Sequence, residues 1–334
     1  MMAGAQDTHG RTPVLLTGAT GFVGRHLYPA LRAAGYEVVC SSRDPDRAAR
    51  HLPERRWVRL DVDDPETFGP ALRGCSAVVY LVHQMGGGGG DYPEREARAA
   101  RALRDAAAAS GIERIVYLGG VAPSGPVSPH LESRLATGEL LRGGSTPAIE
   151  LRAGMIVGAG SASWQIVRDL AARLPAMVLP RWLGNRSSPV AIDDIVSSLL
   201  WALADAPAES AWFDVPGAEV LTHRELITRV AHALGKRPAM VEVPVVTPAL
   251  SSYWIALVTR IGLGLARELV QGLQSDLLPR GEPVWTHLGG RQPVDLERAA
   301  LHALADEDAG EIPAPATRLR METLGRDMAA RRAA

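Results

Sequence analysis

The chain has 334 residues, 46% of them hydrophobic, and a formal net charge of −1. This size and apolar content suffice for one large α/β domain, or for one domain with a smaller lobe. A nearly neutral chain gives no reason to expect nucleic acid or an anionic membrane as its main partner.

The polar residues 1–11 do not form a signal peptide, and no apolar run is long enough to span a membrane. The two cysteines, Cys40 and Cys75, have no metal-binding or redox spacing and are expected to be buried thiols. We therefore expect a cytoplasmic monomer or homodimer that binds a small molecule and no metal.

Strands and helices are predicted to alternate through the first half of the chain. Short apolar runs predict strands, and the segments between them, which start at turn signals and stop at glycines, predict helices. The predicted strands are 14–17, 37–41, 57–60, 77–82, 115–118 and 148–152. The predicted helices are 22–34, 44–51, 64–72, 92–110 and 131–141. This alternation is typical of a doubly wound parallel sheet, the Rossmann architecture.

The second half is less regular and is predicted to form a smaller, mostly helical C-terminal substrate lobe. Proline- and tryptophan-rich segments there alternate with helices at 194–204 and 223–234. We expect a Rossmann domain at 11–160 with return strands around 188–216, a lobe at 161–187 and 217–312, and a tail at 313–334. The tail is rich in arginine, and we expect it to be weakly helical and partly disordered.

A glycine-rich turn follows the first predicted strand, in the stretch Thr17-Gly18-Ala19-Thr20-Gly21-Phe22-Val23-Gly24. Gly18 permits the tight turn, Gly21 lets the backbone approach a phosphate, and Gly24 lets the helix pack close to the strand. The N-terminus of the following helix offers unpaired N–H groups and a partial positive charge to an anion. This order of strand, turn and helix favours a dinucleotide site over a plain loop.

The end of the second strand bears on the choice between NADPH and NADH. Sites selective for NAD have a carboxylate there, about 20 residues past the glycines, for the ribose 2′-hydroxyl. This chain has Ser41-Ser42-Arg43 instead, and the planar cation of Arg43 suits a 2′-phosphate. We therefore expect NADP(H) in preference to NAD(H), unless Arg43 only packs on the adenine. Asp61, after the third strand, suits a contact with adenine N6 or else caps a helix.

A run of five glycines, Gly86 to Gly90, follows Met85 beyond the fourth strand. It lies after the carboxyl end of that strand, where open α/β sheets bind their ligands. Such a run holds no single conformation cheaply, so it is either a lid or substrate loop, or a flexible connection.

Together these segments resemble the extended and atypical members of the short-chain dehydrogenase/reductase superfamily, and most of all its NmrA-like branch. The resemblance covers nearly the whole chain and includes residues 81–85, 150–158, 189–194 and 272–278. It implies an NAD(P)-binding oxidoreductase scaffold. The cofactor contacts that the motifs and the resemblance together imply are Gly18, Ala19, Thr20, Gly21, Phe22, Val23, Arg43, Asp61, Val62, Leu81, Val82, His83, Gly119, Gly120, Arg134, Gly154, Met155 and Ile156.

The catalytic set of that superfamily is absent from this chain. Its reductases use a serine at the end of the fifth strand and a Tyr-x-x-x-Lys motif on the next helix, where the lysine lowers the tyrosine pKa. Here the strand ends in Gly119-Gly120, and His130 to Arg134 occupies the motif position. The single lysine, Lys236, lies far along the chain, and no tyrosine has a lysine four residues later.

His130 and Arg134 are the candidate replacements. A histidine titrates near about 6.5, so His130 needs no lysine to exchange a proton near neutrality. Arg134 keeps its proton but can hydrogen-bond the nicotinamide ribose, as the family's lysine does. A cation beside His130 lowers the histidine pKa and makes it a poorer donor. The alternative is that His130 only caps the helix and faces solvent.

Other polar groups are also candidates near the nicotinamide ring. His83 and Gln84 follow the fourth strand, and Ser124 and Ser128 follow the fifth. The pair Asp193-Asp194 looks like a metal site only superficially, because the family pattern makes it the capped start of a helix.

Two classes of function fit these observations. The first is an NADPH-dependent oxidoreductase acting on a small carbonyl or activated alkene, with an epimerase or dehydratase as a variant. The second is a non-catalytic NAD(P)-binding redox sensor or scaffold, for which the missing residues are expected. An apolar pocket lined by Met155 and tryptophans such as Trp164, Trp212 and Trp254 would favour an enzyme. For residues 253–270, core packing is favoured over membrane-surface association.

Overall fold

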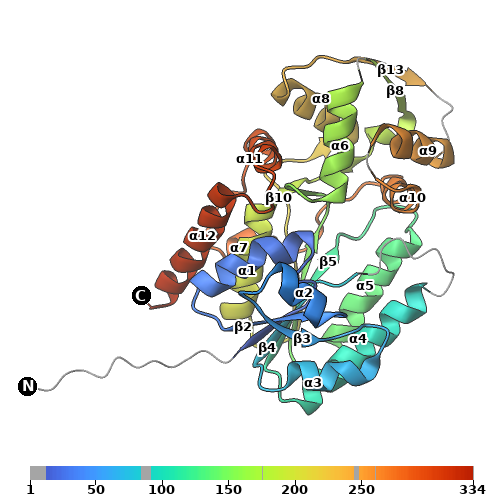
Figure 1. Ribbon diagram of the computed structural model, residues 1–334. Coiled ribbons are helices and arrows are strands. Elements are labelled where there is room, and N and C mark those ends of the chain that lie inside the picture. Colours follow the sequence, from blue (N-terminus) through green and yellow to red (C-terminus); the bar gives the residue numbers. More distant parts are fainter. Residues whose placement is uncertain (1–12, 84–91, 175, 244–247, 260, 334) are drawn as a thin grey trace, which may run out of the picture.

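A seven-stranded parallel sheet forms the centre of the molecule, in the order β11-β6-β5-β4-β1-β2-β3 (Figure 1). This computed structural model describes residues 13–83, 92–174, 176–243, 248–259 and 261–333. The strands of the sheet are β1 (Val14–Leu16), β2 (Val38–Ser42), β3 (Arg56–Arg59), β4 (Ala77–Tyr80), β5 (Arg114–Gly120), β6 (Ala148–Ala153) and β11 (Ala211–Asp214). The strand order reverses between β1 and β4, which is where ligands of such sheets bind.

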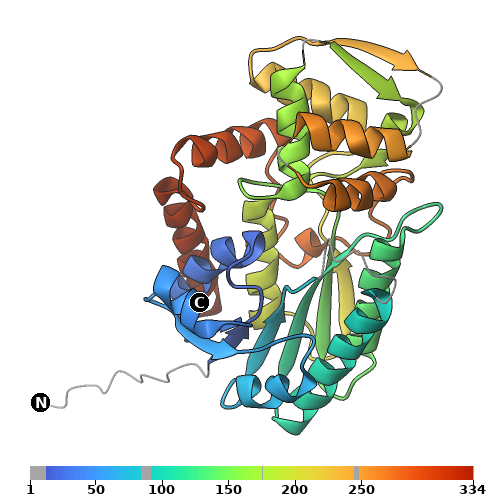
Figure 2. The same cartoon turned by 45° about the vertical axis from the view of Figure 1, so that its right-hand side comes forward.

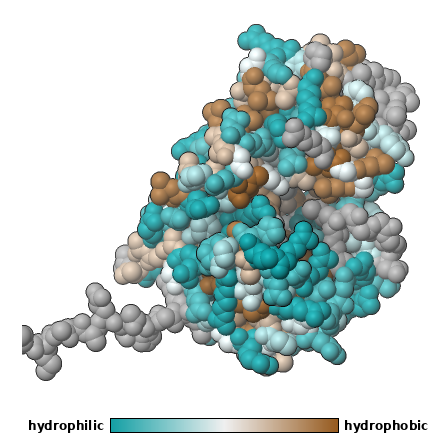
Figure 3. All heavy atoms as spheres, in the orientation of Figure 1, coloured by the Kyte–Doolittle hydropathy of each residue, from teal (hydrophilic) through white to brown (hydrophobic). Residues whose placement is uncertain are grey.

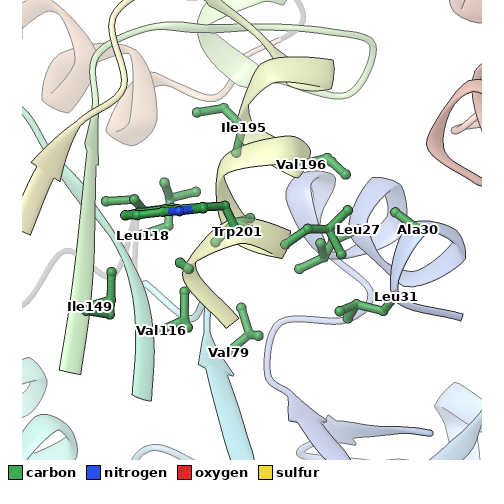
Figure 4. Packing of buried hydrophobic residues seen from close by; sticks show 14 of the residues in the cluster. Leu27, Ala30, Leu31, Val79, Val116, Leu118, Ile149, Ile195, Val196 and Trp201 are labelled. Carbon is green, nitrogen blue, oxygen red and sulfur yellow. The ribbon is translucent and has the colours of Figure 1, made fainter. Parts of the chain in front are cut away.

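Helices cover both faces of the sheet, which confirms the predicted doubly wound architecture. Because successive strand residues point to opposite faces, Leu16 and Val79 pack on one side while Leu15 and Val78 pack on the other. On the first face the Trp201 side chain lies among strand residues and α1 residues (Figure 4). The helices are α1 (Phe22–Ala33), α7 (Ile192–Ala204) and α12 (Pro315–Ala333) on that face, α3 (Phe68–Leu72), α4 (Tyr92–Ala109) and α5 (Pro129–Arg142) on the other, and α2 (Pro45–His51) after β2.

A mostly helical lobe lies beyond the carboxyl ends of the strands (Figures 1 and 2). Asp214, the last residue of β11, accepts hydrogen bonds from the backbone N–H groups of Arg280 and Gly281, each at 2.6 Å. The lobe helices are α6 (Ala162–Arg173), α8 (His223–Ala233), α9 (Pro248–Val258), α10 (Leu263–Gly272) and α11 (Leu296–Asp308). Three two-stranded sheets pair β7 (Ile156–Val157) with β10 (Val190–Ala191), β9 (Arg186–Ser187) with β12 (Leu221–Thr222), and β8 (Ala176–Pro180) with β13 (Ala239–Val243).

The C-terminal segment differs from the weakly helical, partly disordered tail expected from the sequence. It forms the long helix α12, which packs against α1 and α7 (Figure 1). Met321 of this helix is fully buried in the core beside the sheet. The apolar spacing of α12 is weak because Thr317 and Gly325 are also among its buried residues.

Asp193 and Asp194 lie in the first turn of α7 and do not cap it, since the N-cap is Ala191. The fully buried Asp194 carboxylate accepts a hydrogen bond from the Val294 N–H at 2.8 Å. Burial raises the pKa of this carboxyl to about 6. Asp193 Oδ1 accepts a hydrogen bond from Arg320 Nε at 3.1 Å. The two aspartates therefore fasten α12 and the segment before α11 to α7.

Replacing Gly325 with valine should loosen α12. Gly325 lies against the carbonyl oxygen of Ala30 in α1, and a Cβ atom there would collide with it. We expect Gly325→Val to lower the free energy of unfolding by about 2 kcal/mol, measured by urea denaturation. Ala330→Val, at an exposed position of the same helix, is the control and should cost about 0.5 kcal/mol. Equal midpoints for the two variants would contradict this packing.

Candidate dinucleotide site

The glycine turn has the backbone geometry that a dinucleotide pyrophosphate requires. Gly18 has a φ of 63°, and a Cβ atom on it would lie 3.1 Å from the Leu81 carbonyl oxygen. A Cβ atom on Gly24 would lie 2.8 Å from Ala19 Cα, so only glycine lets α1 pack this close. Helix α1 begins at Phe22 with no side-chain cap and no acidic residue in its first turn. The helix N-terminus is therefore suited to an anion.

The turn is tied to the strand beside it at the point where the strand order reverses. The Thr17 hydroxyl donates to the Val79 carbonyl oxygen at 3.2 Å and accepts from the Leu81 N–H at 2.9 Å. Leu81 and Val82, two predicted cofactor contacts, are half-buried at the end of β4. These hydrogen bonds hold the glycine turn beside the end of β4.

A positively charged cleft of about 740 Å³ opens beside Thr20 of the turn. Its lining includes five arginines but only two carboxylates, those of Asp44 and Glu54. The arginines are Arg25, Arg43, Arg47, Arg55 and Arg318. The excess of positive charge makes this cleft a candidate site for an anionic group.

Arg55, which the sequence did not single out, connects the glycine turn to α1 in this cleft. Its Nη1 donates to the Ala19 carbonyl oxygen at 3.1 Å, and its guanidinium lies 4.1 Å from the centre of the Tyr28 ring. These contacts hold the glycine turn against α1. Arg43, by contrast, is exposed at the end of β2.

The turn after β3 carries the other predicted adenosine contacts. The Asp61 carboxylate accepts a hydrogen bond from the Asp63 N–H at 3.1 Å. The N-cap of the following short helix, Pro65–Thr67, is Asp64, so the alternative that Asp61 caps it is wrong. Val62 is buried in the core beneath this turn.

The two glycines at the end of β5, where the superfamily has its serine, lie close to neighbouring side chains. Strand β5 extends to Gly120, farther than predicted, because Gly119 and Gly120 continue the pairing with β6. A Cβ atom on Gly119 would lie 2.9 Å from Glu150 Oε1, and one on Gly120 would lie 3.6 Å from Arg134 Cδ. The Arg134 side chain therefore lies over the strand end. Its Nε is buried and has no hydrogen-bond partner among the described residues, which suits a ligand at this place.

Helices α4 and α5 bring several polar side chains together beside His83. The buried His83 ring has Nε2 3.0 Å from the Leu118 carbonyl oxygen and Nδ1 3.8 Å from Glu96 Oε1. The side chain of Glu96 is only 7% exposed. Its other oxygen, Oε2, accepts a hydrogen bond from the Ser133 hydroxyl at 2.8 Å. The sequence singled out His83 but not Glu96 or Ser133.

The same cluster contains a tyrosine that the sequence did not single out. The Tyr92 hydroxyl donates to Glu96 Oε1 at 3.0 Å and lies 3.1 Å from His130 Nδ1. His130 is therefore turned toward α4, and Ser128 caps α5 by accepting from the Leu131 N–H at 3.3 Å. The alternative that His130 caps the helix and faces solvent is wrong.

Burial decides the protonation of this cluster. It lowers the pKa of His130 to about 4, with smaller contributions in the same direction from Arg134 and His83. Burial and the Arg134 cation also lower the pKa of His83. The pKa of Tyr92 is raised well above its usual value by burial and by the Glu96 charge. At neutral pH both imidazoles are therefore uncharged and the phenol keeps its proton.

The remaining candidate groups have other surroundings. Gly154, Met155 and Ile156 follow β6 and are half-buried, and the Met155 carbonyl oxygen accepts from the Val190 N–H at 2.9 Å. Gln84 and the glycine run that follows it lie outside the described residues.

The hydroxyl and indole candidates do not gather at one pocket. The Ser124 hydroxyl donates to the Asp276 carbonyl oxygen at 3.1 Å. Trp164 is fully buried in the lobe core, Trp212 stacks on Arg152, and Trp254 is exposed.

Comparison with known proteins places this site in a family. A family model described as NAD(P)H-binding matches residues 18–168. A 2′-dehydrokanamycin reductase from Streptomyces kanamyceticus is 31% identical over 260 residues, which are 69% of this chain and 69% of that protein. The chain belongs to the short-chain dehydrogenase/reductase superfamily. A ceramide reductase from Caulobacter vibrioides is 27% identical over 83% of this chain and 89% of its own length.

Solved structures of the superfamily have the same fold. A triphenylmethane reductase from Citrobacter sp., complexed with NADP(H), superposes with a TM-score of 0.66 at 17% identity, over 87% of this chain and 99% of that one. A superfamily member from Agrobacterium tumefaciens with bound NAD has a TM-score of 0.65 at 19% identity, over 89% and 97%.

The lack of the serine, tyrosine and lysine makes this chain an atypical member of the superfamily. It is an oxidoreductase of the NAD(P)-binding type. No described helix is long and apolar enough to cross a membrane.

Proposed function

We propose that the protein is an NADPH-dependent reductase that converts a carbonyl group of a small organic molecule to an alcohol. The observation that carries this proposal is the 3.1 Å contact between the Tyr92 hydroxyl and His130 Nδ1. His130 stands where the family has its catalytic tyrosine, so α4 supplies to this position the phenol that α5 lacks. The relatives are named for different substrates, ceramide and 2′-dehydrokanamycin, so neither name fixes the substrate of this chain.

Arg134 and the glycine turn would hold the cofactor. The turn and the N-terminus of α1 suit the pyrophosphate, and the buried, unpartnered Nε of Arg134 suits the nicotinamide ribose. We propose that residues 161–187 and 217–312 form the substrate lobe, because their helices α6, α8, α9 and α10 lie beyond the carboxyl ends of the strands (Figure 2).

A relay through His130 supplies the proton in this proposal. When bound, the reduced nicotinamide provides a hydride for the carbonyl carbon. The carbonyl oxygen takes a proton from His130 Nε2 while His130 Nδ1 receives the hydroxyl proton of Tyr92. For this step the Tyr92 hydroxyl turns its proton from Glu96 Oε1 to His130 Nδ1, and Tyr92 afterwards regains a proton from solvent. The relay suits the low pKa of His130, because the imidazole changes tautomer without becoming charged.

We assign the cofactor as NADPH rather than NADH because of Arg43 and its positive surroundings. Arg43→Ala should weaken NADPH binding by about 1–2 kcal/mol, roughly 5- to 30-fold, and leave NADH binding unchanged. Fluorescence titration with both nucleotides measures this. Arg50→Ala, an exposed arginine of α2 that does not line the cleft, is the control. Equal losses for both nucleotides, or none, would remove Arg43 from the assignment.

Incubation of the protein with NADPH and a panel of ketones tests the proposed activity. The loss of NADPH absorbance measures the oxidation. We expect turnover with at least one ketone and no oxidation of NADPH without one. Tight NADPH binding without oxidation by any carbonyl would instead indicate a non-catalytic sensor.

A further inference from the structure

Helix α9 exposes an apolar face on the outside of the lobe. Tyr253, Trp254 and Leu257 are 55%, 50% and 77% exposed. On the opposite side of the helix, Ile255 and Ser252 are buried against the lobe core. Figure 3 shows that the lobe carries more hydrophobic surface in this view than the sheet domain, whose visible face is mostly hydrophilic. Core packing of this segment therefore accounts for only one side of the helix.

The sequence around this face contains a stretch with arginines and no acidic residue. Between Glu242 and Glu268 the sequence has no aspartate or glutamate, and its charged residues are Arg260 and Arg267. Arg267 is exposed on α10, the helix that packs against α9. Outward tryptophan, tyrosine and leucine side chains near an exposed arginine have the composition of surfaces that lie in an anionic bilayer interface.

We infer that the exposed face of α9, formed by Tyr253, Trp254 and Leu257, docks the protein on an anionic lipid bilayer. The aromatic and leucine side chains enter the headgroup region, and the exposed arginine beside them lies against lipid phosphates. A second copy of the chain is the alternative occupant of this face, and it would bury the same residues without lipid.

The docking face is connected to the candidate site through α10. Helices α9 and α10 lie side by side, and α10 contacts α5, the helix of His130 (Figures 1 and 2). Gly272, at the end of α10, faces Leu131, the neighbour of His130, with Leu131 Cδ1 3.9 Å from where its Cβ would lie. A bilayer bound to α9 would therefore lie on the lobe whose helix α10 contacts the helix of His130. The docking itself does not depend on the proposed reductase activity.

Sedimentation with vesicles tests the inference without cofactor or substrate. We expect the full-length protein to sediment with vesicles of equal parts phosphatidylcholine and phosphatidylglycerol, and more weakly with phosphatidylcholine alone. Leu257→Glu and Trp254→Ser should each lower the partition coefficient by roughly tenfold or more. Leu301→Glu is the matched control, because Leu301 is 56% exposed on α11, and it should bind as the wild type does.

Thermal melting and NADPH titration establish that each variant is folded. Failure of the wild type to sediment with the anionic vesicles would overturn the inference. So would equal losses in Leu257→Glu and Leu301→Glu. A dimer that Leu257→Glu dissociates, without vesicle binding, would show that the face is a contact between copies and that the lipid assignment is wrong.

Discussion

Replacing His130 with phenylalanine is expected to lower kcat by about 10²- to 10⁴-fold while leaving NADPH affinity near that of the wild type. The reason is that His130 is the group that passes the proton from Tyr92 to the substrate oxygen, whereas the glycine turn holds the nucleotide. Tyr92→Phe keeps the ring but removes the hydroxyl 3.1 Å from His130 Nδ1, so it should also lower kcat. Steady-state kinetics and fluorescence titration separate the two effects. His232→Phe, at an exposed position of α8, is the control.

The pH profile distinguishes this relay from an ordinary histidine acid. Burial, with help from Arg134, lowers the pKa of His130 to about 4, so the imidazole is already neutral at an ordinary histidine's pKa of about 6.5. Below its pKa His130 is protonated on both nitrogens and Nδ1 cannot receive the Tyr92 proton. We therefore expect kcat to fall as the pH drops through about 4, with no inflection near 6.5 from this residue. An inflection near about 6.5 that His130→Phe removes would contradict the relay.

Replacing Gly24 with valine is expected to abolish measurable cofactor binding. A Cβ atom at this position would lie 2.8 Å from Ala19 Cα and would overlap the Gly18 carbonyl oxygen, so α1 must move away from β1. The N–H groups that should hold the pyrophosphate move with it. A loss of about 3 kcal/mol corresponds to more than 100-fold in affinity. Isothermal titration with NADPH measures it.

The matched control for this substitution is Gly69→Val. Gly69 lies in α3, and no atom lies within 4 Å of the Cβ that the substitution would add, outside its chain neighbours and the helix's own backbone. Gly69→Val therefore measures the loss of stability caused by valine in place of a helical glycine, without a collision between the added Cβ atom and the backbone. Cofactor affinity in Gly69→Val should equal that of the wild type. If Gly24→Val bound NADPH equally well, the glycine turn would not be the pyrophosphate site.

The order of strands and helices was predictable because its signals are local and agree with one another. The glycine turn predicted both the end of β1 and the start of α1, and Gly18 has the positive φ that this turn requires. Helix α12 was not predictable in the same way. Its buried face includes Thr317 and Gly325. Asp193, which accepts a hydrogen bond from Arg320 of this helix, lies on α7, far away in the sequence.

The candidate site was predictable only in part, for a related reason. Residues that follow strands, such as His83 and Arg43, lie at the carboxyl edge of the sheet by topology alone. Tyr92 and Glu96 reach the site because α4 packs against α5, across 38 residues of sequence in the case of Tyr92 and His130. Tyr92 and Glu96 are four residues apart, a spacing that places them on one face of α4, but it does not indicate which helix that face meets.

A structure with NADP⁺ bound would test the central claim most directly. We expect the pyrophosphate on the glycine turn, the 2′-phosphate beside Arg43, and the nicotinamide against Gly120 with its C4 carbon on the side of His130. A nicotinamide ring turned away from His130 and Tyr92, or a 2′-phosphate away from Arg43, would contradict the proposed NADPH-dependent reductase.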